Sequence, residues 1–127
     1  MREMENNIKS QHQIMVESLI KYLIKDGYIN VRADIPGFDP PDNIYCGSNL
    51  FLIPDVTGVK NGWGQIFDVE TVDSVNQDNT AIKWICFGAH AKKFNKGFNV
   101  VVPEIVKSDV KELLQSHGIP AGVWSLG

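Results

Sequence analysis

Residues 50–72, LFLIPDVTGVKNGWGQIFDVETV, carry the signals that set the fold, because two β-rich stretches flank a tight turn. Residues 50–59 and 65–72 are rich in β-branched and aromatic residues, and we expect each to form a strand. Asn61 and Gly62 lie between them, and Asn-Gly is the strongest short hairpin signal because both residues tolerate positive φ. With these two residues at the centre of the turn, Gly58 faces Gln65 and Asp55 faces Asp68.

This register predicts a cluster of carboxylates on one face of the hairpin. Directly opposed residues share a face with Cβ atoms roughly 5 Å apart, so Asp55 and Asp68 would be neighbours. Glu70 lies two residues beyond Asp68 and therefore shares its face. Opposed acids repel, and a divalent cation such as Mg²⁺ would offset that repulsion. The alternative is that the acids face solvent, or that the glycines beside Trp63 open a bulge and shift the register.

The chain before the hairpin predicts a helix, a strand and a long loop. Apolar residues recur at helical spacing, and Gly27 follows as a helix stop. The residues of this apolar stripe are Val16, Leu19, Ile20, Leu23 and Ile24. Residues 28–35 alternate apolar and polar side chains and predict a half-buried strand. Residues 36–49 contain three prolines and two glycines and predict a loop.

The chain after the hairpin predicts a helix over 80–94, a strand over 97–105, a short helix and an edge strand over 122–126. The expected buried stripe of the first of these helices, which Trp84 and Phe87 broaden as core packing, consists of Ile82, Ile85, Cys86 and Ala89. Pro103 should mark the end of the apolar strand, and Ser108 should cap the short helix. The predicted fold class is α/β, with one mixed sheet flanked by helices in a single domain over 1–127.

Composition limits the class of protein. The chain has 127 residues, of which 43% are hydrophobic and 21% are charged. This balance can build a core. The chain has no apolar run long enough to span a membrane and begins without a secretory signal pattern, and we expect a cytoplasmic protein. Cys46 and Cys86 lie far apart without a ligand-like neighbour, and we expect unpaired cysteines that pack as small hydrophobic residues.

The charge is unevenly distributed along the chain. The formal net charge of −3 gives no global sign of nucleic-acid binding. Residues 34–78 hold eight acids and one base, whereas residues 81–100 hold four lysines and no acid. A metal site beside a phosphate-binding surface would need this arrangement. Lys92, Lys93 and Lys96 are the candidates for contact with DNA; the alternative is a solvated helix end whose cations complement the helix dipole.

Two short motifs resemble a known family. Ile53-Pro54-Asp55, followed by Asp68-Val69-Glu70, resembles the motif of the PD-(D/E)xK nuclease superfamily, which has the restriction-endonuclease-like fold. The expected order of elements follows the αβββαβ core of that fold over roughly residues 14–119. The resemblance implies a hydrolase that cleaves nucleic acid with magnesium.

The resemblance also implies a set of site residues. Asp55 and Asp68 would be metal ligands for Mg²⁺ or Mn²⁺, together with the backbone carbonyl of Val69. Glu70 stands where the family usually has a lysine, and Lys83 from the following helix would supply that lysine instead. The implied catalytic residues are therefore Asp55, Asp68, Glu70 and Lys83. In resolvase-like members a glutamate of the first helix joins the site. Glu17 lies off the apolar stripe of the matching helix and is the candidate, although Val16 sits nearer the expected place.

Two functions remain open on the sequence. The first is a magnesium-dependent nuclease that hydrolyses DNA phosphodiester bonds. The second is a catalytically inactive relative of the nuclease fold that binds nucleic acid or a protein, which the missing motif lysine and the acidic net charge favour. A homodimer is expected from the resemblance, because small nucleases of this kind use two active sites to cut two strands.

Overall fold

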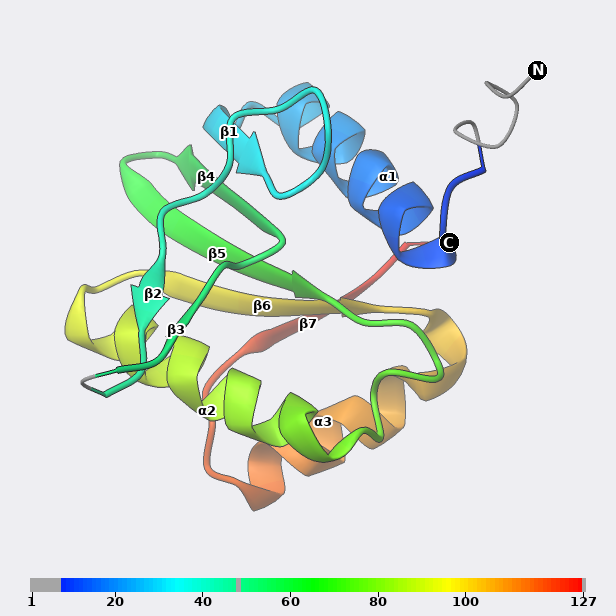
Figure 1. Cartoon of the computed structure of the whole chain (residues 1–127), viewed down its shortest axis with the longest axis vertical. Coiled ribbons are helices and arrows are strands. Elements are labelled where there is room, and N and C mark those ends of the chain that lie inside the picture. The colour runs from blue at the N-terminus through cyan, green and yellow to red at the C-terminus, as the bar shows by residue number, and fades with distance from the viewer. Residues whose placement is uncertain (1–7, 48, 127) are drawn as a thin grey trace.

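The structure, a computed structural model, describes residues 8–47 and 49–126 and builds a five-stranded mixed sheet with helices on both faces (Figure 1). The helices are α1 (Gln11–Lys25), α2 (Asp78–Lys93) and α3 (Lys107–Ser116), with a 3₁₀ turn at Glu104–Val106. The strands are β1 (Ile29–Ala33), β2 (Ile44–Tyr45), β3 (Phe51–Leu52), β4 (Val56–Lys60), β5 (Trp63–Val69), β6 (Gly97–Val102) and β7 (Gly122–Ser125). The predicted α/β class, with helices flanking a mixed sheet, is confirmed.

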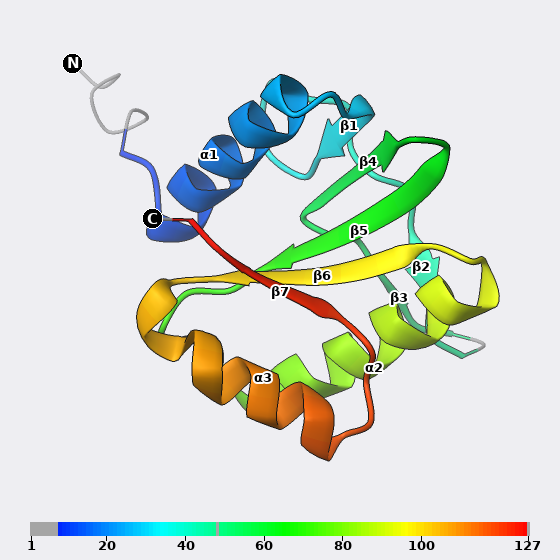
Figure 2. The ribbon, with the colours of Figure 1, turned by 180° about the vertical axis from the view of Figure 1, so that it is seen from behind.

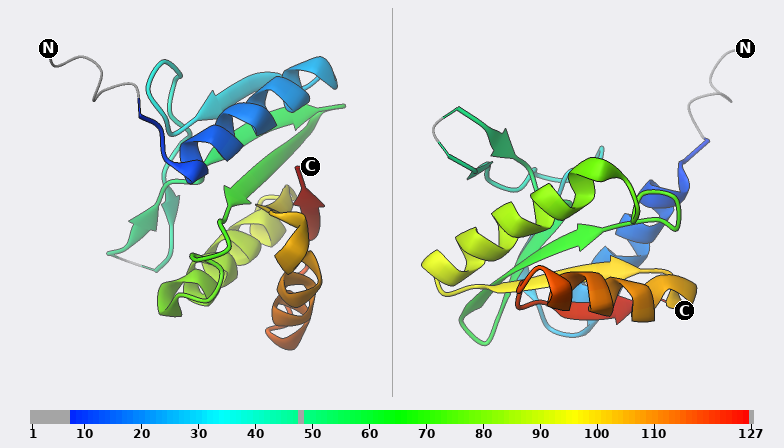
Figure 3. Two further views of the ribbon diagram at one scale, coloured as in Figure 1. Left: turned by 90° about the vertical axis from the view of Figure 1, so that its right-hand side faces the viewer. Right: turned by 90° about the horizontal axis from the view of Figure 1, so that it is seen from below.

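The main sheet has the order β1-β4-β5-β6-β7 and changes direction at β5. The β1–β4 and β4–β5 pairs are antiparallel, whereas the β5–β6 and β6–β7 pairs are parallel. Helix α1 covers one face, and α2 and α3 cover the other (Figure 3). Figure 2 shows β7 at the edge of the sheet beside β6, as expected for the last strand. Strand β5 is thus the boundary between the antiparallel and parallel halves.

Helix α1 forms where the apolar stripe predicts it. Ser10 caps its first turn, because its side-chain oxygen accepts a hydrogen bond of 3.0 Å from the backbone N–H of Gln13. The helix ends at Lys25, and Gly27 adopts a φ of +93°, a conformation that glycine adopts without strain. The buried residues of the helix are Val16, Leu19, Ile20 and Leu23. The predicted stripe is confirmed except at Ile24, which is exposed.

The β4–β5 hairpin has the predicted register. Asn61 and Gly62 have positive φ angles of 53° and 81°, as the tight turn requires. The ladder pairs Lys60 with Trp63 and Gly58 with Gln65, and it ends at the pair of Val56 and Phe67. Asp55 therefore lies one residue outside the ladder, at the end of the hairpin opposite the turn.

The single strand expected over 50–59 is wrong. The chain forms β3 at Phe51–Leu52 and β4 at Val56–Lys60, and Pro54 lies in the break between them. Proline has no N–H for a strand ladder, so the extended run cannot continue through this residue. Strand β3 pairs instead with β2, which lies in the region expected to be a loop, and the two form a separate small sheet.

Helix α2 forms as predicted, and its expected buried stripe is confirmed only in part: Cys86 is buried, whereas Ala89 is exposed. Trp84, Phe87 and Ala91 are buried, whereas Ile82 and Ile85 of the predicted stripe are 61% and 48% exposed. The buried face thus turns toward the two large aromatic side chains, whose burial removes more apolar area from water.

The last helix and the apolar strand before it also form. Ser108 does not cap α3, because the helix begins at Lys107 directly after the 3₁₀ turn. The expectation for that cap is therefore wrong. Strand β6 is buried as predicted and ends before Pro103.

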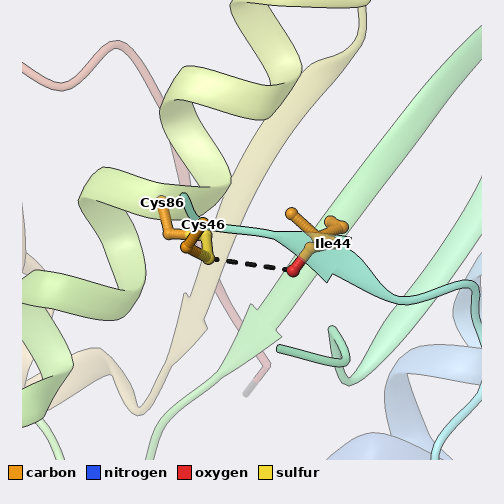
Figure 4. Close-up of a disulfide and its surroundings, with 3 residues drawn as sticks. All are labelled: Ile44, Cys46 and Cys86. Atoms are coloured by element: carbon orange, nitrogen blue, oxygen red, sulfur yellow. Dashed lines mark hydrogen bonds between the residues drawn. A yellow bond between two sulfur atoms is a disulfide. The ribbon is translucent and has the colours of Figure 1, made fainter. Parts of the chain in front are cut away.

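The expectation of two unpaired cysteines is wrong, because Cys46 and Cys86 form a disulfide (Figure 4). Their Cα atoms lie 5.6 Å apart, the usual separation for such a bond. The bond ties the end of β2 to the middle of α2; Cys46 Sγ also lies 3.7 Å from the carbonyl oxygen of Ile44. Disulfides persist mainly in oxidising compartments, so the expectation of a cytoplasmic location loses the support it drew from unpaired thiols.

The three helices lie against the sheet and are short. Within residues 8–47 and 49–126, no helix is both long enough and apolar enough to cross a membrane.

Candidate active site

The predicted acidic residues gather where β4 begins and β5 ends. Asp68 belongs to β5, Glu70 directly follows it, and Asp55 directly precedes β4. Along β5, Ile66 belongs to the core on the α2 side, whereas Phe67 and Val69 belong to the core on the α1 side. Side chains alternate along a strand, so Asp68 faces α2 like Ile66. The structure thus places a carboxylate inside the layer between the sheet and α2.

Asp55 is held by both of its carboxylate oxygens. Its Oδ2 atom accepts a hydrogen bond of 2.6 Å from the backbone N–H of Val69. Its Oδ1 atom lies 3.0 Å from Nε2 of His12, in the first turn of α1. The backbone carbonyl of Asp55 accepts a further hydrogen bond from the N–H of Asp34. These contacts fix Asp55 beside the backbone that joins the other two acids.

Asp68 is almost fully buried, with 1% of its surface exposed. Its Oδ2 atom accepts a hydrogen bond of 2.8 Å from the indole N–H of Trp84, and its Oδ1 atom lies 3.2 Å from Nζ of Lys83. Burial raises the pKa of Asp68, and a hydrogen bond with Glu70 and the charge of Lys83 oppose that rise. A buried carboxylate with these partners is satisfied on both oxygens.

Glu70 is similarly buried, with 2% of its surface exposed. Ser74 Oγ donates a hydrogen bond of 2.6 Å to Oε1. Oε2 has no hydrogen bond of good geometry, although Lys83 Nζ lies 2.5 Å away. Burial, the hydrogen bond with Asp68 and the negative charge of Asp68 raise the pKa of Glu70 to about 8. Glu70 therefore holds a proton near neutral pH.

Lys83 provides the positive charge of the cluster. It lies on α2, where the neighbouring residues Lys83 and Trp84 both reach the carboxylate of Asp68. Burial alone would lower the pKa of Lys83, but the nearby carboxyl groups of Asp68 and Glu70 raise it, so the ammonium form is retained.

The structure brings together the predicted residues Asp55, Asp68, Val69, Glu70 and Lys83, but not Glu17. Glu17 lies on α1 and forms an ion pair of 3.0 Å with Lys9 instead.

Three further residues contact the cluster without having been assigned to it from the sequence. His12 is the residue of α1 that reaches Asp55. No local pattern in the sequence brings His12 near Asp55, because the two residues belong to segments far apart in the chain. Trp84 was expected to be core packing, and Ser74 carried no signal at all.

A divalent cation of the implied kind needs hard oxygen ligands, and the cluster provides them. Asp55 and Asp68 contribute carboxylates. The β4–β5 ladder ends at the pair of Val56 and Phe67, two residues before Val69, so β4 supplies no ladder partner for the Val69 carbonyl. Mg²⁺ is usually held by one or two carboxylates and keeps several waters, which fits this donor set. Across the described part of the chain, however, no group of three or more His, Cys, Asp or Glu side chains is arranged to hold a metal ion.

Comparisons with known proteins found no relative of this chain. No protein-family model, no curated protein and no solved structure matches this chain. The function therefore has to be argued from the geometry of the site.

Proposed function

We propose that this chain is a metal-dependent nuclease that hydrolyses DNA phosphodiester bonds on a restriction-endonuclease-like fold. The order α1, β1, β4, β5, α2, β6 supports the αβββαβ core that the motif resemblance implies. The pairing supports it as well, because three antiparallel strands are followed by a parallel β6. The small sheet of β2 and β3 is an insertion in that core, between β1 and β4.

One observation carries the proposal: Lys83 Nζ lies 3.2 Å from Asp68 and 2.5 Å from Glu70. The motif has Glu70 where the family usually has lysine, and the ammonium is supplied from α2 at the same place. Asp55 and Lys83 also reach the surface, with 16% and 31% of their side chains exposed, so substrate has access on that side of the cluster.

In this proposal each side chain has a defined role. Asp55, Asp68 and the Val69 carbonyl would hold Mg²⁺ or Mn²⁺, which when bound supplies Lewis-acid stabilisation of phosphate charge. Lys83 stabilises the negative charge that develops on the phosphate oxygens. Glu70 accepts a proton from the attacking water once it is deprotonated, so activity should rise with pH as the pH approaches the Glu70 pKa of about 8. His12 positions the Asp55 carboxylate.

The test is cleavage of duplex, branched and single-stranded DNA with Mg²⁺ or Mn²⁺. Asp55→Asn keeps the size of the side chain and removes its charge, and we expect it to abolish cleavage. Glu112→Gln, which makes the same charge change on the exposed face of α3, is the control and should cleave normally. The metal should also raise Tm in the wild type, because a ligand that binds the native state stabilises it. The nuclease is refuted if the wild type shows no cleavage and the metal does not raise its Tm.

A second candidate is an inactive relative that binds nucleic acid or a protein. The burial of Asp68 and Glu70 favours it, because a satisfied ion pair with Lys83 is also what a structural cluster requires. Its DNA contacts would use three lysines exposed at the end of α2 and just beyond it, Lys92, Lys93 and Lys96. DNA binding without metal-dependent cleavage would favour this function. A homodimer remains part of the first proposal, and sedimentation equilibrium would test it.

A further inference from the structure

A second feature of the same sheet face is a cavity of about 340 Å³ that the acidic cluster does not use. It lies on the α2 side of the β4–β5 hairpin and is bordered by β1, by the segment that leads into β2, and by the end of α2. Gly64 lines this cavity without a side chain, and a Cβ atom at this position would lie 3.3 Å from the aliphatic part of the Lys96 side chain. Its lining includes Arg32, Asn43, Pro54, Ile66, His90 and Lys96.

The charged groups of this cavity favour an anion. Arg32 comes from β1 and Lys96 from the turn after α2, so two separate elements bring cations to one space. Asp42 is the acid of the lining, but its side chain is 98% exposed and lies 3.8 Å from Arg32. Such a pairing is weak and screened by solvent. Burial, followed by the charges of Lys96 and Lys93, lowers the pKa of His90. The local potential at this wall is therefore positive.

The remaining lining suits a base. Ile44 and Ile66 provide apolar surface, and Asn43 contributes an amide that can both donate and accept hydrogen bonds. A few polar groups around an apolar surface, in a volume of this size, are typical of sites for small organic ligands. A base that remains stacked in a duplex has no access to so small a space, whereas an unpaired base does.

The cavity leads directly to the acidic cluster. Pro54 lines the cavity and immediately precedes Asp55. Ile66 also lines it and lies two residues before Asp68 on the same face of β5. Two residues along a strand correspond to a step of about 7 Å. A nucleic-acid strand that leaves the cavity beside Pro54 would next meet Asp55, whose side chain is 16% exposed.

We propose that this cavity holds one unpaired nucleotide of a single-stranded nucleic acid, with its phosphate between Arg32 and Lys96. The step from this nucleotide to a cleaved bond rests on the proposed function; the binding itself does not. A positively charged groove that also contacts bases is the usual design of proteins that bind single strands. The proposal names the substrate class as single-stranded or unpaired rather than fully duplex.

The test measures binding by fluorescence anisotropy of a labelled single-stranded oligonucleotide, with the full chain carrying Asp55→Asn so that cleavage does not interfere. Arg32→Gln and Lys96→Gln should each weaken binding about tenfold and flatten its salt dependence, because each removes a phosphate contact. Lys111→Gln makes the same charge change on the exposed face of α3 and should weaken binding less than about twofold. Thermal unfolding of each variant checks that it folds.

The competitors decide which chemistry the cavity recognises. An unlabelled single strand should displace the probe at least about tenfold better than the matching duplex. The proposal is overturned if Lys111→Gln weakens binding as much as Lys96→Gln, if the duplex competes equally, or if inorganic phosphate displaces the probe as well as the unlabelled strand does. If the wild type binds a single strand but does not cleave it, the nuclease is overturned and the cavity assignment stands. If the wild type cleaves and neither Arg32→Gln nor Lys96→Gln affects cleavage, the cavity assignment is overturned and the nuclease stands.

Discussion

The ammonium of Lys83 lies 2.5 Å from Oε2 of Glu70, although the two residues belong to different elements. Glu70 directly follows β5, whereas Lys83 lies on α2. Both side chains are removed from most solvent contact, and Asp68 shares the same ammonium at 3.2 Å. The stability and the protonation of this end of the sheet therefore depend on three groups acting together.

The first prediction concerns removal of the ammonium. Lys83→Met keeps the stem and leaves two buried acids without their cation, which should lower the free energy of unfolding near pH 8 by about 2 kcal/mol. The loss stays below that of a fully buried pair because the Lys83 side chain is 31% exposed and solvent screens its charge. At about pH 5 the loss should be smaller, since the acids then hold protons. Urea unfolding measures it, and Lys83→Arg, which retains the charge, should lose less at both pH values.

The second prediction concerns the pH dependence of stability. The pKa of Glu70 is raised from 4.5 to about 8 in the folded state, so between these values the unfolded state binds fewer protons than the folded state. Stability contributed by this proton is present below pH 4.5 and is lost as pH rises toward 8. Glu70→Gln removes this pH-dependent loss of stability, because glutamine does not titrate. Over that range, in metal-free buffer, the Tm of the wild type should fall more than that of the variant by roughly 15 °C. Parallel Tm curves would contradict the raised pKa.

The third prediction concerns His12 and Asp55. The hydrogen bond to Asp55 raises the pKa of His12 above 6.5, and burial only partly opposes it. The stability from this contact is present below pH 6.5 and is lost as pH rises through the raised pKa. NMR titration of the imidazole should show a lower His12 pKa in Asp55→Asn than in the wild type. Glu112→Gln should leave it unchanged; an equal change in both variants would show that general charge, and not the contact, is responsible.

The fourth prediction concerns the disulfide between Cys46 and Cys86. The two cysteines are separated by 40 residues in the sequence. Loop-closure entropy assigns a bond across a loop of this size about 4 kcal/mol of stability. The free energy of unfolding, measured with urea, should be lower by that amount in the double variant Cys46→Ser with Cys86→Ser than in the oxidised wild type. A reducing agent should bring the wild type to the stability of the variant and should leave the variant unchanged. A reducing agent without effect on the wild type would show that the bond does not form.

The elements that could be predicted from the sequence are those whose signals are local. The Asn61–Gly62 turn fixed the hairpin register, because only residues that tolerate positive φ close such a turn, and the register in turn brought Asp55 toward Asp68. The helical stripe of α1 and the buried strand β6 were also readable, since apolar periodicity reports burial directly. The break at Pro54 was readable in principle, because a proline without an N–H interrupts a ladder.

The α/β class, the hairpin and the acidic residues at its end could be predicted from the sequence alone, because each follows from spacing along one or two neighbouring elements. The remaining parts of the site depend on contacts between residues that are distant in the chain. The family resemblance implied that Lys83 joins the site. The contacts of His12 with Asp55, of Trp84 with Asp68, and of Cys46 with Cys86 emerged only once the chain was folded. Those contacts depend on how α1 and α2 are oriented on the two faces of the sheet, and helix orientation is set by the packing of whole faces rather than by any local pattern.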